Sequence, residues 1–118
     1  MATKKKEYEK RPWGDYEVLK REPGMWVKRI EVKPHARLSL QKHAQRKEHW
    51  IITAGRGIVR IGDNDISVEK NSVVDIPVET FHRMSNVGDE PMIFIEVAFG
   101  EYLEEDDSVR SEDDYGRA

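Results

Sequence analysis

The sequence predicts an all-β fold. Short stretches in which apolar and polar residues alternate follow one another along the chain, with turn-forming residues between them. Before residue 100, no convincing stretch places apolar residues at the spacing of three and four that is typical of a helix. The 118 residues suffice for one domain with one core, and neither an internal repeat nor a linker rich in glycine and proline divides them. We therefore expect one all-β domain, built as a sandwich or a barrel.

The expected strands are short and closely spaced. In chain order they are residues 15–20, 24–33, 48–54, 57–62, 66–69, 72–77, 81–86 and 91–100. The sequence AGRG (54–57) supplies glycines that turn the chain, and GDND (62–65) is typical of a hairpin turn. Residues 1–10 form a charge run without periodicity, which we expect to be flexible. Residues 11–118 then form the single domain, with an acidic C-terminal tail from Glu101 that holds a turn or a short helix.

Composition argues against several classes of protein. The formal net charge is -3, whereas general nucleic-acid binding needs a basic face. The chain has no cysteine and therefore no disulfide framework, which fits a reducing compartment. It has no run of about 18 apolar residues and no apolar segment of a secretory signal. We expect a cytoplasmic protein that binds neither nucleic acid nor membranes.

Alternation predicts an inward-facing lysine. Side chains alternate across a strand, and the apolar face of the second expected strand carries Trp26, Lys28, Ile30 and Val32. A lysine that points into a barrel is costly unless it is paired or used. Glu96 faces the same way as Phe94 in the last strand and is a partner for it. Lys28 and Glu96 are therefore candidates for proton transfer; the alternative is that Lys28 reaches the rim or serves only as a counter-charge.

A polar face next to the third expected strand raises the question of a metal site. Its side chains are two residues apart: Arg37, Ser39, Gln41 and His43. A loop at 44–47 returns the chain so that Glu48 lies near His43, and His82 begins a later strand. Gln41, His43, Glu48 and His82 can thus converge from three strands. Two imidazoles, a carboxylate and an amide oxygen suit a divalent cation; the alternative is an ordinary polar turn.

The spacing of these residues resembles the two cupin motifs. The first motif is Gly, five residues, His-x-His, three or four residues, Glu, six residues, Gly; the second is Gly, five residues, Pro-x-Gly, two residues, His, three residues, Asn. The corresponding residues here are His35, Gln41, His43, Glu48 and Gly55, followed by Asn71, Pro77, Glu79, His82 and Asn86. Three motif glycines that serve turns are thus replaced, by His35, Asn71 and Glu79. The resemblance implies a double-stranded β-helix, a jelly-roll barrel of two antiparallel sheets.

A more specific resemblance is to the C-terminal cupin domain of type II phosphomannose isomerases. It rests on seven segments in the same order and spacing: RPWGDYEVL, VKRIEVKP, LSLQKHAQRKEHW, IPVETFHRMSN, IEV, YLEEDDSVR and EDDYGR. Such proteins usually also carry a mannose-1-phosphate guanylyltransferase domain, whose glycine-rich nucleotide loop these residues lack, so we expect no nucleotidyl transfer. The resemblance implies isomerisation of mannose 6-phosphate to fructose 6-phosphate. Zn²⁺ is the preferred ion, with Mn²⁺, Co²⁺ and Ni²⁺ as alternatives, and analogy with other cupins favours a homodimer.

An isomerase of sugar phosphates also needs cations for the phosphate and for the charge of the enediolate. Arg37 lies in register with the expected ligands, and Arg46 lies in the loop between them and matches the family's arginine before Glu-His. Arg110 belongs to the family-like sequence DDSVR. We expect Arg37, Arg46 and Arg110 to bind the substrate, and Arg46 to act in catalysis together with Lys28 and Glu96.

Departures from the family pattern keep another function open. Ala44 and Gln45 stand where the family often has histidines, and Ala98 stands at a usual glutamine. These differences favour, as the alternative, a non-catalytic sugar-binding or regulatory cupin. A metal-dependent dioxygenase is less favoured, because iron oxygenases usually use three histidines or two histidines and a carboxylate, and Gln41 departs from both sets.

Overall fold

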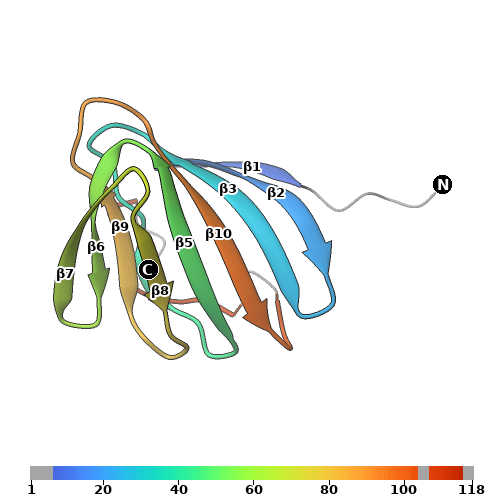
Figure 1. Ribbon diagram of the computed structural model, residues 1–118. Helices are drawn as coiled ribbons and strands as arrows, with labels where there is room; N and C mark the ends of the chain where they lie inside the picture. Colours follow the sequence, from blue (N-terminus) through green and yellow to red (C-terminus); the bar gives the residue numbers. More distant parts are fainter. Residues whose placement is uncertain (1–6, 104–106, 116–118) are drawn as a thin grey trace.

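The structure is a computed structural model that describes residues 7–103 and 107–115, and its regular elements are all β-strands (Figure 1). Its strands are β1 (Tyr8–Arg11), β2 (Gly14–Glu22), β3 (Met25–Val32), β4 (Leu40–Lys42), β5 (Arg46–Ala54), β6 (Arg56–Ile61), β7 (Asn64–Glu69), β8 (Val73–Ile76), β9 (His82–Asn86), β10 (Met92–Gly100) and β11 (Val109–Glu112). Within these described residues there is no helix long and apolar enough to cross a membrane. The all-β prediction is confirmed.

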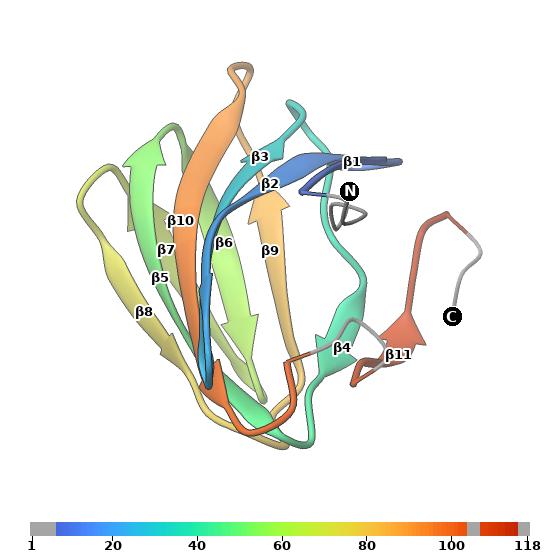
Figure 2. The ribbon, with the colours of Figure 1, turned by 90° about the vertical axis from the view of Figure 1, so that its right-hand side faces the viewer.

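The strands form two sheets that face each other (Figure 2). The larger sheet has the order β1-β2-β3-β10-β5-β8, and the smaller has the order β11-β4-β9-β6-β7. Neighbouring strands are antiparallel in both sheets. The chain crosses between the sheets repeatedly, from β5 to β6, from β7 to β8 and from β9 to β10. This is the jelly-roll arrangement that the sequence predicts.

Alternation along the strands fills the space between the sheets. The buried side chains of β3 are Trp26, Lys28, Ile30 and Val32, as the sequence predicts. Those of β10 are Met92, Phe94, Glu96 and Ala98. The apolar core draws on both sheets, and its fully buried members are Val32, Ile52, Val59, Met84, Met92 and Phe94. The inward positions of Lys28 and Glu96 are therefore confirmed.

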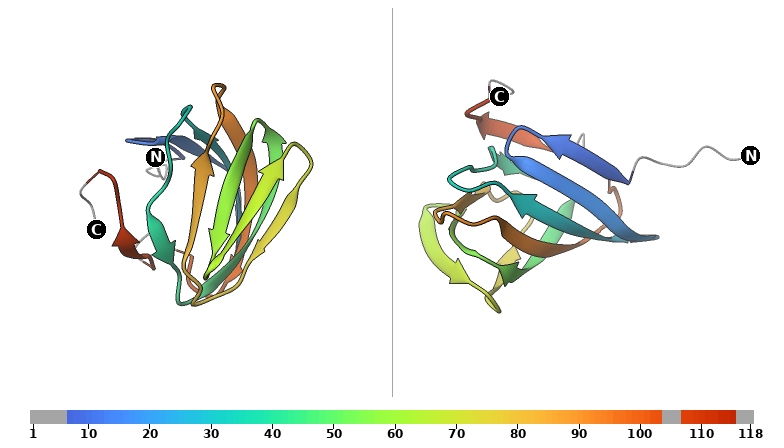
Figure 3. Two further views of the ribbon diagram at one scale, coloured as in Figure 1. Left: turned by 90° about the vertical axis from the view of Figure 1, so that its left-hand side faces the viewer. Right: turned by 90° about the horizontal axis from the view of Figure 1, so that it is seen from above.

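Both ends of the chain are more ordered than we expected. Within the segment 1–10 that was expected to be flexible, Tyr8 to Lys10 belong to β1 and pair with β2, while residues 1–6 lie outside the described residues. In the acidic tail, β11 pairs with β4, so this part is a strand, not a turn or a helix. Figure 3 shows β11 and the β1–β2 hairpin on the same side of the molecule. Strands β1 and β11 each lie at the edge of a sheet, where polar side chains are tolerated on either face. Neither strand therefore shows apolar alternation.

Three residues at the replaced motif glycines keep a left-handed backbone. His35, Asn71 and Glu79 have φ angles of 61°, 79° and 59°, and no other non-glycine residue of the described chain has a positive φ. A side chain in this conformation costs roughly 1–2 kcal/mol, less for asparagine. Gly62, one of the glycines expected at a turn, has a φ of 59° and lies in the turn of the β6–β7 hairpin, in which Ile61 pairs with Asn64. The turns of the motif are thus present, but without the glycines that would adopt a positive φ with no strain.

Candidate metal centre

The register of the larger sheet gathers inward-facing charges at one end of the barrel. Glu96 of β10 lies opposite Lys28 of β3 and opposite Trp50 of β5. Two residues further along β10, on the same face, Ala98 lies opposite Glu48 of β5. Lys28, Glu48 and Glu96 are all at most 5% exposed. Antiparallel pairing therefore places two carboxylates and an ammonium close together, although they are far apart in sequence.

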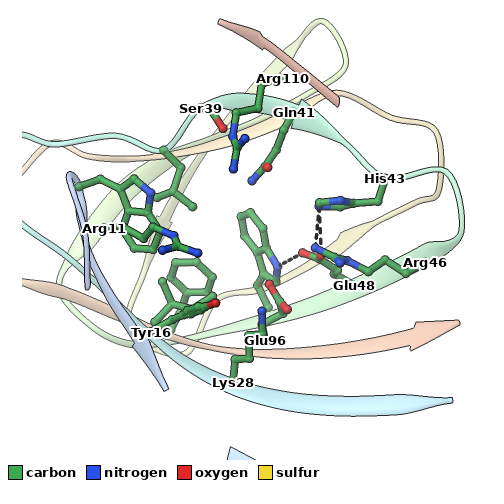
Figure 4. Close-up of a pocket in the computed structure, with 15 residues that line it drawn as sticks. Arg11, Tyr16, Lys28, Ser39, Gln41, His43, Arg46, Glu48, Glu96 and Arg110 are labelled. Carbon is green, nitrogen blue, oxygen red and sulfur yellow. Dashed lines mark hydrogen bonds and ion pairs between the residues drawn. The ribbon is translucent and has the colours of Figure 1, made fainter. Parts of the chain in front are cut away.

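The smaller sheet adds two histidines to this end. His43 follows β4, His82 opens β9, and the backbone of Gln41 pairs with that of His82. One potential ligand atom from each of His43, Glu48 and His82 lies within 4.8 Å of the others, and all three residues are buried. The amide of Gln41 points into the same cavity (Figure 4). Of the four residues whose spacing predicts convergence, His43, Glu48 and His82 therefore lie together, and Gln41 lines the adjoining cavity.

Backbone carbonyls fix the histidine tautomers. The Nδ1 atom of His82 lies 2.9 Å from the carbonyl oxygen of Thr80, and Nδ1 of His43 lies 3.0 Å from that of Asp107. A carbonyl oxygen only accepts hydrogen bonds, so each Nδ1 carries the hydrogen and each Nε2 presents a lone pair. Nε2 of His82 is the one buried side-chain nitrogen or oxygen of the described residues that has no hydrogen-bond partner. An unpartnered lone pair beside a second imidazole and a carboxylate fits a metal cation.

The side chain of Arg46 contacts two of the three candidate metal ligands. Its Nε donates to Oε2 of Glu48 at 2.8 Å, and its Nη2 lies 3.2 Å from Nε2 of His43. The guanidinium also stacks over Trp26, 4.7 Å from the ring centroid. Trp50 Nε1 donates to the other oxygen of Glu48 at 2.9 Å. The guanidinium of Arg46 thus already places a positive charge against the candidate ligand atoms of Glu48 and His43. A metal ion that binds these atoms would have to displace it from them.

Burial and charge set the protonation states of the ligands. Burial lowers the pKa of His43 to about 4 and also lowers that of His82, so both imidazoles are neutral near pH 7. Burial alone would raise the pKa of Glu48, but the charge of Arg46, the two histidines and the hydrogen bond with Glu96 together outweigh it and lower the pKa to about 2. Neutral imidazoles and an ionised carboxylate are the forms that bind metal ions.

Glu96 has the opposite protonation state. Burial, and then the negative charge of Glu48, raise the pKa of Glu96 to about 8 against the opposing effect of Lys28. Glu96 accepts a hydrogen bond from Trp26 Nε1 at 2.7 Å and shares another with Glu48. Lys28 Nζ lies 4.3 Å from the ring centroid of Tyr16 and 4.0 Å from that of Trp26. The site thus holds a carboxyl that carries a proton beside one that does not.

A cavity of about 90 Å³, several times the space that one water needs, adjoins His43, Glu48 and Glu96 but is not lined by His82. Its lining residues are Arg11, Trp13, Tyr16, Lys28, Ile30, Leu38, Ser39, Gln41, His43, Arg46, Glu48, Trp50, Phe94, Glu96 and Arg110. Figure 4 shows His43, Arg46 and Glu48 at one end and Arg11 and Arg110 toward the other. Arg110 is exposed and Arg11 partly exposed, whereas His43 and Glu48 are buried, so the arginine end is the mouth.

One expected substrate-binding residue lies elsewhere. Arg37 is absent from the cavity lining; its Nε and Nη2 donate to the carboxylate of Asp114 at 2.7 and 2.8 Å. The prediction assumed that alternation runs unbroken from residue 37 to 43, but β4 begins only at Leu40, after the left-handed turn at His35. Arg46 also differs from its expected place in a loop, because it is the first residue of β5.

Several residues of the site escaped the sequence analysis. Asp107 of the acidic tail accepts hydrogen bonds from the backbone N–H groups of Ala44 and Gln45, and its carbonyl orients His43. Arg11 and Tyr16 reach the cavity from the β1–β2 hairpin. The family-like segments that contain these residues were the available indication, since alternation says nothing about contacts between distant strands.

Comparison with known proteins identifies the family of this chain. Residues 1–113 match the family described as "Mannose-6-phosphate isomerase C-terminal". The chain belongs to this family. Its resemblance to type II phosphomannose isomerases, inferred from the motifs, is thereby confirmed.

Curated relatives in the family are much longer than this chain. The chain is 48% identical over 107 residues to the xanthan biosynthesis protein XanB of Xanthomonas campestris pv. campestris (strain B100), covering 91% of this chain and 23% of that protein. It is 45% identical over 107 residues to the mannose-1-phosphate guanylyltransferase ManC of Salmonella typhimurium, covering 91% and 22%. The chain therefore spans less than a quarter of the length of these relatives.

Solved structures support the fold. A protein from Klebsiella pneumoniae described as having a double-stranded β-helix domain matches with a TM-score of 0.72 and 16% identity, over 81% of this chain and 82% of that one. At this level of identity the likeness concerns the fold alone. The cupin fold of this family member is thus established by strand topology and by structural similarity.

Proposed function

We propose that this chain is a metal-dependent isomerase that converts mannose 6-phosphate to fructose 6-phosphate. The observation that carries the proposal is a metal-ligand set that includes an unpartnered histidine nitrogen and whose members His43 and Glu48 line one cavity together with the buried, proton-carrying carboxyl of Glu96. Membership of the mannose-6-phosphate isomerase C-terminal family supports it. Both features suit aldose–ketose isomerisation, in which an electrophile polarises the sugar oxygens while a base moves a carbon-bound proton.

His43, Glu48, His82 and Gln41 would hold the ion. Zn²⁺ suits two imidazole nitrogens, a carboxylate and an amide oxygen, and undergoes no redox chemistry; Mn²⁺, Co²⁺ and Ni²⁺ accept the same donors. When bound, such an ion would supply a Lewis acid that polarises the sugar oxygens. Arg46, which contacts two of these ligand atoms and lines the cavity, would have to leave those atoms.

Glu96 is the proposed carrier of the carbon-bound proton. As a carboxylate it takes the proton from C2, and the electrons of the broken C–H bond form the C1–C2 double bond of an enediolate while the aldehyde oxygen gains the charge. The carboxyl then returns the proton to C1, and the hydroxyl proton of O2 passes to O1, which leaves a ketone at C2. A pKa near 8 makes both forms of Glu96 accessible close to neutral pH.

Lys28 and Arg46 are the proposed partners of the developing negative charge. Both are at most 4% exposed, so their charges act in a region of low dielectric constant. Lys28 lies opposite Glu96 across the β3–β10 pair. Its charge therefore also favours the carboxylate form of Glu96, which is the form that accepts the proton from C2.

The test is an isomerase assay on the chelated protein, repeated after adding back Zn²⁺, Mn²⁺, Co²⁺ or Ni²⁺. We expect fructose 6-phosphate to form only with added metal, and turnover to be lost in His82→Ala and in Glu96→Gln. Arg60→Gln, far from the cavity on β6, is the matched control and should keep its activity. If folded, metal-loaded wild-type protein gives no turnover with any of the four ions, the proposal is wrong.

A non-catalytic sugar-binding cupin is the second candidate. The contacts of Arg46 with Glu48 and His43 favour it, because the guanidinium satisfies two ligand atoms without any ion. In that case the protein binds the sugar phosphate equally well with and without metal and gives no product. The homodimer and the cytoplasmic location stay predictions.

A further inference from the structure

Two arginines from different sheets line the mouth of the cavity. Arg11 belongs to β1 at the edge of the larger sheet, and Arg110 belongs to β11 at the edge of the smaller one. Figure 4 shows both guanidinium groups directed into the cavity, on the side away from His43 and Glu48. The expected phosphate-binding set contained Arg110 but not Arg11, and it included Arg37, which lies outside the cavity.

Arg11 is held in place while most of its donors stay available. Its Nη2 donates to Oε2 of Glu9 at 2.7 Å, its Nη1 to the carbonyl oxygen of Lys10 at 3.5 Å, and its guanidinium carbon lies 5.3 Å from the ring centroid of Tyr16. Tyr16 hydroxyl donates to the same oxygen of Glu9, which steadies the group. An arginine has five N–H donors, so three of them lack an acceptor among the described residues.

Arg110 is the complementary group. Its side chain forms no hydrogen bond or ion pair with any other residue of 7–103 and 107–115, and its backbone pairs with that of Gln41. Arg110 thus enters the cavity from the strand next to a candidate ligand. Its guanidinium is therefore available to an anion that enters the mouth, next to the donors that Arg11 has left after its ion pair with Glu9.

We propose that Arg11 and Arg110 together form a phosphate subsite, which rests on the proposed binding of a sugar phosphate in this cavity. Two guanidinium groups that approach from opposite walls match a tetrahedral dianion, which accepts hydrogen bonds in several directions. The buried end of the cavity then receives the carbonyl end of the sugar. The substrate class is a sugar monophosphate whose ester lies at the end of the chain opposite to the reacting carbons, and unphosphorylated sugars bind weakly.

The test is calorimetric titration of the full chain with mannose 6-phosphate, with mannose and with inorganic phosphate. We expect wild-type protein to prefer mannose 6-phosphate over mannose. Arg11→Gln and Arg110→Gln should each weaken binding of mannose 6-phosphate by about 10–100-fold, the range expected for a lost charge-assisted hydrogen bond, and leave mannose unchanged. Arg29→Gln, whose side chain pairs with Glu31 and lies outside the cavity lining, should bind all three ligands as wild type does.

Two further measurements keep the subsite separate from folding and from catalysis. Arg11→Lys retains the charge without the fork of donors, so a folded Arg11→Lys should bind mannose 6-phosphate more tightly than Arg11→Gln and less tightly than wild type. Wild-type affinity in both Arg11→Gln and Arg110→Gln, or equal affinity of wild type for mannose and mannose 6-phosphate, would overturn the subsite. Arginine-dependent binding without isomerase turnover would support the subsite and reject the isomerase instead.

Discussion

The two ends of the barrel interior are equally buried but chemically opposite. At one end lie apolar side chains with no exposed area: Val32, Ile52, Val59, Met84, Met92 and Phe94. At the other end, charged or ionisable side chains are at most 5% exposed: Lys28, His43, Arg46, Glu48, His82 and Glu96. The same strands β3, β5, β9 and β10 run through both ends. Burial alone therefore does not determine which chemistry the interior holds.

The difference shows where the fold gains stability and where it loses some. Apolar burial stabilises the fold, whereas burying charges costs free energy unless they are closely paired. The charged end keeps an unpartnered nitrogen on His82 and a carboxyl at Glu96 with a pKa of about 8. Such groups are retained at sites of function, so mutations at the two ends should have separable effects.

The largest expected effect on stability is at the apolar end. Ile52→Ala removes a fully buried side chain from between the sheets and should lower the free energy of unfolding by about 2–5 kcal/mol. Its neighbour Ile51 points to the outer face and is 41% exposed, so Ile51→Ala is the matched control with a smaller loss. Urea unfolding of the three proteins measures both values. Equal losses would contradict the assignment of the core.

The next effect concerns the tail that supports the charged end. Asp107→Ala removes the carboxylate that holds the backbone of Ala44 and Gln45, and thereby loosens the carbonyl that orients His43. Groups that orient a metal ligand typically contribute about 10–100-fold to metal affinity. We expect a loss of that size in Zn²⁺ titrations, with Asp65→Ala on the exposed strand β7 as the control. Unchanged affinity would mean that the tail does not support the site.

The charged end should also make the metal-free protein sensitive to pH. Glu96 has a folded pKa of about 8 against an ordinary value of 4.5, so between these values the folded state holds a proton that the unfolded state has released. Its stabilising contribution is complete below pH 4.5 and is lost as the pH rises through 8. His43 acts in the opposite direction between pH 4 and 6.5, because its folded pKa is lowered.

Between pH 6.5 and 8 the contribution of Glu96 therefore acts without that of His43. The free energy of unfolding should fall over this range, by at most about 1.4 kcal/mol per pH unit. Urea unfolding in the presence of a chelator measures the slope. Glu96→Gln should flatten it, and an equal slope in this variant would assign the pH dependence to other groups.

The smallest expected effect lies outside the interior. Glu79 has a φ of 59° at a position where the motif has glycine, and its side chain lies 58% exposed, 3.7 Å from Lys42. Glu79→Gly should raise the free energy of unfolding by about 0.5–1 kcal/mol, since the relief of backbone strain exceeds the added entropy of the unfolded chain. Glu90→Gly, where φ is not positive, should destabilise instead. A loss of stability in Glu79→Gly would show that the turn is unstrained.

The sequence predicted most accurately what depends on strand alternation. Lys28 and Glu96 face inward because both belong to long strands paired on both sides, where a shift of one residue would expose the whole core face. Arg37 was misplaced because it precedes a three-residue strand and follows a left-handed turn, and its one isolated bridge, to Ser85, does not continue the alternation of β4.

Contacts between distant segments were beyond prediction from alternation. The pairing of β11 with β4 brings Asp107 to His43 and Arg110 to the cavity, and β1 brings Arg11 to the mouth. The contact of Arg46 with Glu48 and His43 depends on its side-chain rotamer and on the stacking surface of Trp26. These features follow from tertiary packing, on which a single sequence gives no direct information.

Titration of the metal-free protein with Zn²⁺ tests most directly whether the charged end is a metal centre. One ion should bind per chain near pH 7, and His82→Ala should abolish binding while its circular dichroism spectrum stays that of the wild type. Binding should weaken as the pH falls toward 4, because His43 then takes up a proton. Failure of folded wild-type protein to bind Zn²⁺, or undiminished binding in His82→Ala, would contradict the assignment of this end of the barrel.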